Sequence, residues 1–92
     1  MKVIVRAKAE DDIDQIFAWI AHDNLAAATE VVSHIRERIN RLATPALSHM
    51  GHPGQVKGTL EIVVRPYIIV YKLFARRPEI VILSVVHGAQ NR

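Results

Sequence analysis

The side chains best suited to chemistry lie in the second half of the chain, within or beside its apolar runs. They are His87, Arg65, Tyr67 and Tyr71. Histidine transfers protons near neutral pH, and the planar guanidinium of arginine binds phosphate. Cleavage of RNA at a 2′-hydroxyl needs a general base, an acid for the leaving oxygen and a cation for the phosphorane charge. His87, Arg65 and Tyr71 are therefore the candidate catalytic residues if the chain is a nuclease.

Each of these residues also has a structural interpretation. His87 ends an apolar run next to Gly88, where it can simply cap a strand. Arg65 precedes a proline in a short turn, and turn residues are usually solvated. Tyr67 and Tyr71 are four residues apart, so on one strand they share a face, where tyrosines commonly pack against the sheet.

The charges are unevenly distributed along the chain, although the net charge is only +3. Residues 1–30 hold three Lys/Arg and six acids, whereas residues 31–92 hold nine Lys/Arg and three acids. A basic second half suits a polyanionic or acidic partner, and an ordinary solvated surface is the alternative. The candidate nucleic-acid or phosphate contacts are Lys57, Lys72, Arg76 and Arg77.

Two histidines in a loop, His49 and His52, have a spacing that can ligate a metal. The chain has no cysteine and no carboxylate pair close to them in sequence, so a pair of solvated loop histidines is the simpler interpretation. We expect neither a metal nor a cofactor.

The length of 92 residues and mass of 10.3 kDa indicate a single domain over residues 1–92. No apolar stretch approaches the roughly 20 residues that span a bilayer, and the start of the chain lacks the apolar run of a signal peptide. Without cysteines there is no disulfide framework, so we expect a cytoplasmic protein. Secreted, membrane-spanning and multidomain proteins are excluded on these grounds.

Periodicity predicts an opening strand and a pair of helices. Residues 3–5 are β-branched and predict a strand. Asp11 or Asp12 is the expected N-cap of a first helix. On this helix Trp19 is expected to seal the edge against the sheet, and contact with a partner is the alternative. Asp23 or Asn24 is the expected cap of a second helix that ends near residues 44–45. The apolar face of the first helix comprises Ile13, Ile16, Phe17 and Ile20, and that of the second comprises Leu25, Ala28, Val32, Ile35, Ile39 and Leu42.

The rest of the chain predicts a loop and three strands. Residues 44–58 are rich in glycine and proline, and the runs 60–64, 67–74 and 80–86 are rich in Val, Ile and Tyr. Short turns between the runs indicate a meander of antiparallel strands. The predicted fold is α+β: an antiparallel sheet with a two-helix hairpin packed on one face, in the order β-α-α-β-β-β.

Segments along nearly the whole chain resemble one known family. They are AEDDI at 9–13, IFAWI at 16–20, DNLAAA at 23–28, GHPG at 51–54, GTLEIVV at 58–64, PYIIVY at 66–71 and ILSVVHGA at 82–89. In their order and spacing they resemble the RelE/ParE toxins of type II toxin–antitoxin systems. The resemblance implies the same fold and a growth-arresting protein that a cognate antitoxin neutralises in a hetero-oligomeric complex.

The resemblance leaves the target open. RelE-like members cut messenger RNA on the ribosome, and ParE-like members poison DNA gyrase. This sequence has Ile68 and Ile69 where RelE places an arginine, and it lacks the terminal arginine-and-tyrosine arrangement of RelE. We therefore favour a ParE-like gyrase poison; a ribosome-dependent endoribonuclease and a binding module without toxicity are the alternatives.

Overall fold

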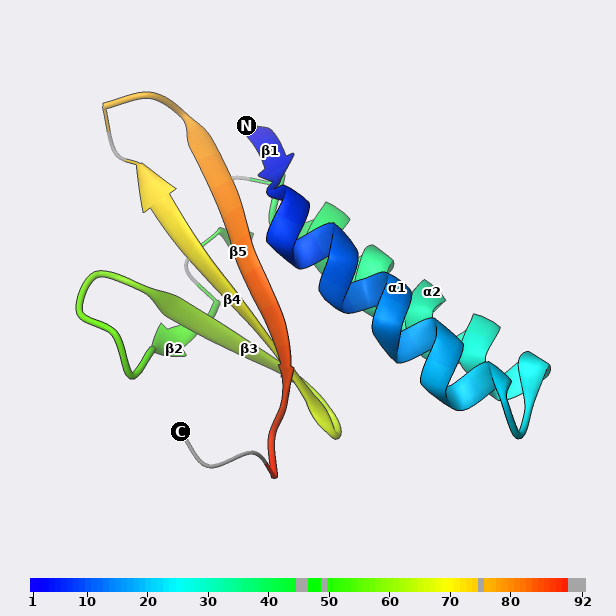
Figure 1. Cartoon of the computed structure of the whole chain (residues 1–92). Helices are drawn as coiled ribbons and strands as arrows, with labels where there is room; N and C mark the ends of the chain where they lie inside the picture. Colours follow the sequence, from blue (N-terminus) through cyan, green and yellow to red (C-terminus); the bar gives the residue numbers. More distant parts are fainter. Residues whose placement is uncertain (45–46, 49, 75, 90–92) are drawn as a thin grey trace.

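The computed structural model describes residues 1–44, 47–48, 50–74 and 76–89. Figure 1 shows a five-stranded sheet beside a pair of helices. In chain order the elements are β1 (Lys2–Val5), α1 (Ala7–Ala21), α2 (Leu25–Arg41), β2 (His52–Pro53), β3 (Leu60–Val64), β4 (Tyr67–Phe74) and β5 (Glu79–His87). The strands lie in the order β1-β5-β4-β3-β2. The predicted α+β fold with a helical hairpin is confirmed.

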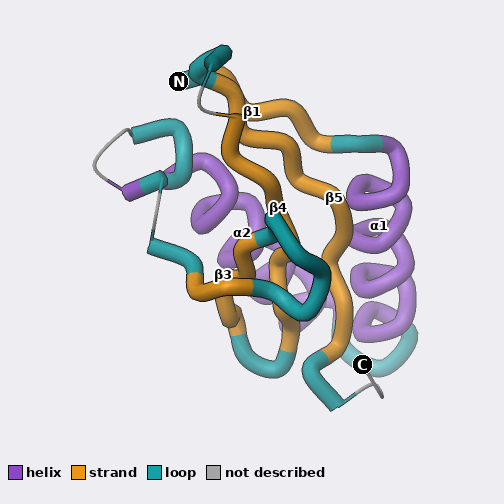
Figure 2. Tube along the Cα trace, turned by 90° about the vertical axis from the view of Figure 1, so that its left-hand side faces the viewer, coloured by secondary structure: helices purple, strands orange, loops and turns teal. Residues whose placement is uncertain are grey.

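Both helices lie on one face of the sheet, and the β2–β3 loop lies over part of the other face, where Glu61, Val70 and Val81 are buried (Figures 1 and 2). The core lies between the two layers. Its buried residues are Ala9, Ile13, Ile35, Ile39, Leu42, Ile62, Tyr67, Ile69, Tyr71, Ile80, Ile82 and Val85. In β4 the core residues alternate with residues of the face opposite the helices, as the two-residue period of a strand requires. Among the described residues, no helix is long and apolar enough to cross a membrane.

The prediction for the start of the first helix was wrong. Helix α1 begins at Ala7 with Arg6 as its N-cap, so Asp11 and Asp12 lie inside the helix. Alanine, lysine and glutamate at positions 7–10 are strong helix formers, which extends the helix upstream. Of the two caps expected for the second helix, Asn24 is the one observed, because its side chain accepts a hydrogen bond from the Ala27 N–H at 2.9 Å.

The two helices are joined by an ion pair as well as by their apolar faces. The guanidinium of Arg36 on α2 donates two hydrogen bonds to the Glu10 carboxylate on α1, at 2.8 and 2.7 Å. The hydrogen bond from Arg36 holds the pKa of Glu10 below its usual value. This bidentate geometry fixes the relative position of the helices along their axes.

The sheet departs from the predicted all-antiparallel arrangement at its first strand. Strands β3, β4 and β5 form the expected meander, but β1 pairs with β5 in parallel. A short turn forces its two strands to be antiparallel, whereas β1 reaches β5 through a long connection and has no such constraint. Strand β2 was not predicted; it pairs with β3 within the expected loop. A bulge interrupts the β4–β5 ladder next to Tyr71.

Candidate functional site

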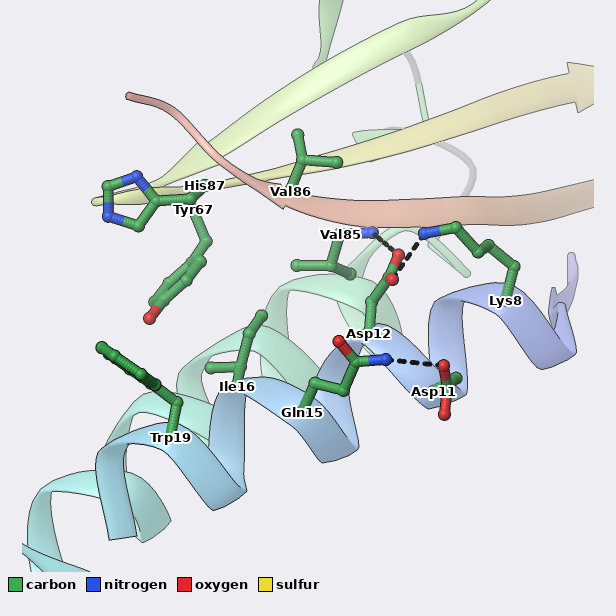
Figure 3. Close-up of a pocket in the computed structure, with 10 residues that line it drawn as sticks. All are labelled: Lys8, Asp11, Asp12, Gln15, Ile16, Trp19, Tyr67, Val85, Val86 and His87. Atoms are coloured by element: carbon green, nitrogen blue, oxygen red, sulfur yellow. Dashed lines mark hydrogen bonds and ion pairs between the residues drawn. The ribbon is translucent and has the colours of Figure 1, made fainter. Parts of the chain in front are cut away.

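A groove of about 560 Å³ lies between α1 and β5, and the predicted residue His87 lines it. Figure 3 shows Trp19 and Tyr67 at the same end of the groove as His87. The groove is lined by Lys8, Asp11, Asp12, Gln15, Ile16, Trp19, Tyr67, Val85, Val86 and His87. One helix and the last two strands of the meander therefore build this candidate site.

The His87 ring is held in place by two neighbours. It lies edge-on to the ring of Tyr67, its register partner on β4, with 5.4 Å between the ring centroids and an interplanar angle of 86°. The N–H of Ala89 donates a hydrogen bond to Nδ1 of His87 at 3.0 Å. A backbone N–H can only donate, so Nδ1 is the acceptor and the neutral ring carries its proton on Nε2.

This tautomer limits what His87 can do chemically. A general base needs a free lone pair within reach of the proton that it removes. In His87 the lone pair of Nδ1 is already used and Nε2 holds a proton, so the neutral ring offers a donor and no free acceptor. The arrangement therefore suits binding of an acceptor group better than proton abstraction.

Arg65 lies at the same end of the molecule as His87. It is exposed in the turn between β3 and β4, beside Pro66. The N–H of Gly88 donates a hydrogen bond to the Pro66 carbonyl at 2.7 Å, which ties the end of β5 to this turn. The structure thus brings together two predicted residues that are 22 positions apart in the sequence.

Tyr71 is completely buried and has no exposed hydroxyl for chemistry. Its hydroxyl donates to the Ser48 carbonyl at 3.0 Å and accepts from the Gly51 N–H at 3.1 Å. Burial raises the pKa of Tyr71. The hydroxyl anchors the segment before β2 onto β4, so the candidate catalytic role of Tyr71 is not supported by its position.

The predicted phosphate-binding cations lie away from His87 and Arg65. Arg76 and Arg77 follow the far end of β4, and Lys72 lies near that end. The eight residues of β4 separate this end from Tyr67 by about 23 Å, at about 3.3 Å per residue. His87 and Arg65 therefore do not form one site with these cations.

The comparisons with known proteins place the chain in a family. Residues 3–92 match the family described as "ParE toxin of type II toxin-antitoxin system, parDE". The chain belongs to the ParE toxin family. The protein named "Putative toxin Y4kP" from Sinorhizobium fredii is 38% identical over 81 residues, covering 86% of this chain and 79% of that protein.

Solved structures agree with this membership at the level of the fold. The chromosomal ParDE system from P. aeruginosa matches with a TM-score of 0.80 and 24% identity, covering 95% of each chain. The RelBE2 toxin–antitoxin complex from Mycobacterium tuberculosis matches with a TM-score of 0.59 and 24% identity, covering 94% of this chain and 95% of that chain.

Two residues of the groove differ from the interpretation that their sequence positions favoured. Trp19 was expected to seal the helix–sheet edge, but its side chain is 80% exposed. Asp12 was expected to be a cap, but its Oδ2 accepts a hydrogen bond from the Val85 N–H at 2.9 Å and its Oδ1 pairs with Lys8 (Figure 3). The sequence spacing of Asp12 could have indicated this contact. Asp12 lies three residues from the buried Ala9 and four from Ile16, so the three residues share one face of the helix.

No group of three or more metal-binding side chains gathers anywhere in the described part of the chain. His52 is exposed on β2, and its predicted companion His49 lies outside the described residues.

Proposed function

We propose that this ParE-family toxin arrests growth by poisoning DNA gyrase and that a cognate antitoxin neutralises it. The observation that carries the proposal is the match of residues 3–92 to the ParE toxin family. Both target and antitoxin would place its action in the cytoplasm.

The geometry of the groove supports a toxin that acts by binding. His87 presents a donor, Tyr71 is buried, and the predicted phosphate-binding cations lie at the other end of β4. The exposed Trp19 offers the kind of aromatic anchor that protein interfaces favour. A groove with these properties fits a protein partner better than a scissile phosphate.

The alternative function is a ribosome-dependent endoribonuclease of the RelE type. One observation favours it: Arg65 and His87 lie at the same end of the sheet, joined through the Gly88–Pro66 hydrogen bond. For catalysis, the hydrogen bond from the Ala89 N–H to Nδ1 would have to break before His87 became a base at that nitrogen.

A paired assay with purified toxin tests the proposal. In the first arm, gyrase supercoils relaxed plasmid in the presence of ATP, and linear DNA is scored after detergent and protease treatment. In the second arm, ribosomes translate a defined message whose ends are mapped by primer extension. We expect loss of supercoiling and accumulation of linear DNA, with intact message. Intact gyrase activity with cuts inside codons would refute the gyrase proposal and establish the nuclease.

Variants at the predicted catalytic positions test whether these residues take part in any cleavage of messenger RNA. We expect His87→Ala and Arg65→Ala to leave messenger RNA intact, as the wild type does. If the wild-type toxin cuts messenger RNA and either variant abolishes cutting while still binding the antitoxin, the residue acts in catalysis. Co-purification with the antitoxin controls for folding, because an unfolded toxin would not be retained.

A further inference from the structure

The two layers of the molecule carry opposite charge. Residues 7–41, which form the helical layer, hold seven of the nine acids of the chain and four Lys/Arg. Residues 50–89 hold five Lys/Arg and two acids, Glu61 and Glu79. Glu61 is buried, and Glu79 lies 3.9 Å from Arg77. The sheet side therefore presents a net positive surface.

Four cations of the sheet side gather near the β4–β5 hairpin and the β2–β3 loop. We call Lys57, Lys72, Arg76 and Arg77 the basic hairpin surface. Lys72 alternates with the core residues of β4, so it belongs to the face opposite the helices. Its Cε lies 3.6 Å from the position that a Cβ on Gly58 would occupy, which places Lys72 beside the loop that carries Lys57.

An aromatic ring connects Lys72 to the tip of the hairpin. The Nζ of Lys72 lies 5.8 Å from the centroid of the Phe74 ring, and the Cζ of Arg77 lies 5.9 Å from it. Arg76 and Arg77 are exposed. Figure 1 shows that the hairpin and the β2–β3 loop both project to the side away from the helices. The four cations are thus held on one side of the protein.

We propose that the basic hairpin surface binds the phosphate backbone of duplex DNA, specifically the DNA that gyrase holds. This inference rests on the proposed function. Protein–DNA interfaces are strongly positive, whereas the cores of protein interfaces are depleted of charge, which favours DNA over a protein at this surface. A two-stranded ribbon such as the β4–β5 hairpin also fits the width of a major groove.

Binding through these cations has a measurable signature. Contacts to phosphates position a protein without reading the sequence, and each contact releases counterions. The logarithm of the association constant therefore falls linearly with the logarithm of the salt concentration. Removing one phosphate-binding cation lowers the magnitude of that slope by about 1.

The experiment measures fluorescence anisotropy of a labelled duplex of arbitrary sequence with purified toxin over a salt series. We expect Lys72→Gln, Arg76→Gln and Arg77→Gln each to reduce the slope by about 1. Arg76→Lys retains the charge and is expected to keep the wild-type slope. Arg38→Gln, a matched loss of one charge on the helical layer, is the control and is expected to change the slope little.

Three outcomes would overturn the inference. They are the absence of duplex binding by the wild type, an equal effect of Arg38→Gln, and binding only to a single-stranded RNA of the same length. Circular dichroism of each variant excludes misfolding as the cause.

The gyrase assay separates this inference from the proposed function. If wild-type toxin inhibits gyrase and the three glutamine variants inhibit equally well, the DNA contact is refuted and the gyrase proposal stands. If wild-type toxin does not inhibit gyrase, the gyrase proposal fails and with it the assignment of gyrase-held DNA. Weaker inhibition by the variants, with gyrase itself still captured by them, supports both.

Discussion

Replacement of Asp12 tests how α1 is fixed to the sheet. Strand β1 pairs with β5 only as far as Ile82, so the edge of β5 beyond that residue has no strand neighbour on the β1 side. The Asp12 carboxylate accepts the Val85 N–H at this edge. The Asp12 side chain is 12% exposed, so water reaches it poorly. Asp12→Ala removes the partner of Val85 and leaves a partly buried backbone donor.

The expected loss of stability can be worked out from three contributions. A hydrogen bond to a charged group contributes about 1.5–3 kcal/mol. The ion pair with the exposed Lys8 adds about 0.3–0.5 kcal/mol, and the higher helix propensity of alanine returns roughly 0.5 kcal/mol. We therefore expect Asp12→Ala to lower the free energy of unfolding by about 1.5–3 kcal/mol. In a domain of this size that lowers Tm by about 10 °C.

Urea denaturation followed by circular dichroism measures this change, with Asp11→Ala as the matched control. Asp11 is an exposed acid of the same helix whose partner is Gln15, so its loss should alter stability by less than about 0.5 kcal/mol. Asp12→Asn retains a carbonyl acceptor, so its free energy of unfolding should lie between those of Asp12→Ala and Asp11→Ala. Equal stability of Asp12→Ala and Asp11→Ala, with unchanged hydrogen exchange at the Val85 amide, would refute the reasoning.

Three further predictions concern other contacts. Tyr71→Phe should lower the free energy of unfolding by about 1–3 kcal/mol in urea, because the Ser48 carbonyl and the Gly51 N–H lose their hydroxyl partner. Glu10→Gln should cost at most about 1 kcal/mol at neutral pH. Because Arg36 lowers the pKa of Glu10 from 4.5, that stabilisation is present above pH 4.5 and is lost as the pH falls through the folded value. Urea melts of Glu10→Gln and wild type should therefore converge in acid. Trp19→Ala should leave Tm nearly unchanged, because the side chain is 80% exposed, but weaken gyrase inhibition in the supercoiling assay.

The helices and most strands could be predicted because residues close together in the sequence determine them. The apolar stripe of α2 has a helical period and ends in buried Ile35, Ile39 and Leu42, as expected. The β-branched runs predicted β3 and β4 with their correct bounds. Asn24 was among the expected caps because a cap acts on the residues that follow it directly.

The candidate site was predicted only in part. Sequence spacing placed His87 at the end of a strand, and the structure puts it in the groove. The same reasoning treated Tyr67 and Tyr71 alike because they share a face, yet Tyr67 lines the groove while Tyr71 anchors the segment before β2. Two residues on one face differ when different segments pack over them, and a sequence period does not specify those segments.

The sequence by itself determined the two helices, four of the five strands and the family of the protein. Tertiary structure alone decided that β1 runs parallel to β5, that Asp12 pairs with Val85 and that Trp19 is exposed. It also decided that the basic hairpin surface lies at the opposite end of β4 from His87. The physical reason is range: propensity and periodicity act over a few residues, whereas these features depend on which distant segments the packed core brings together.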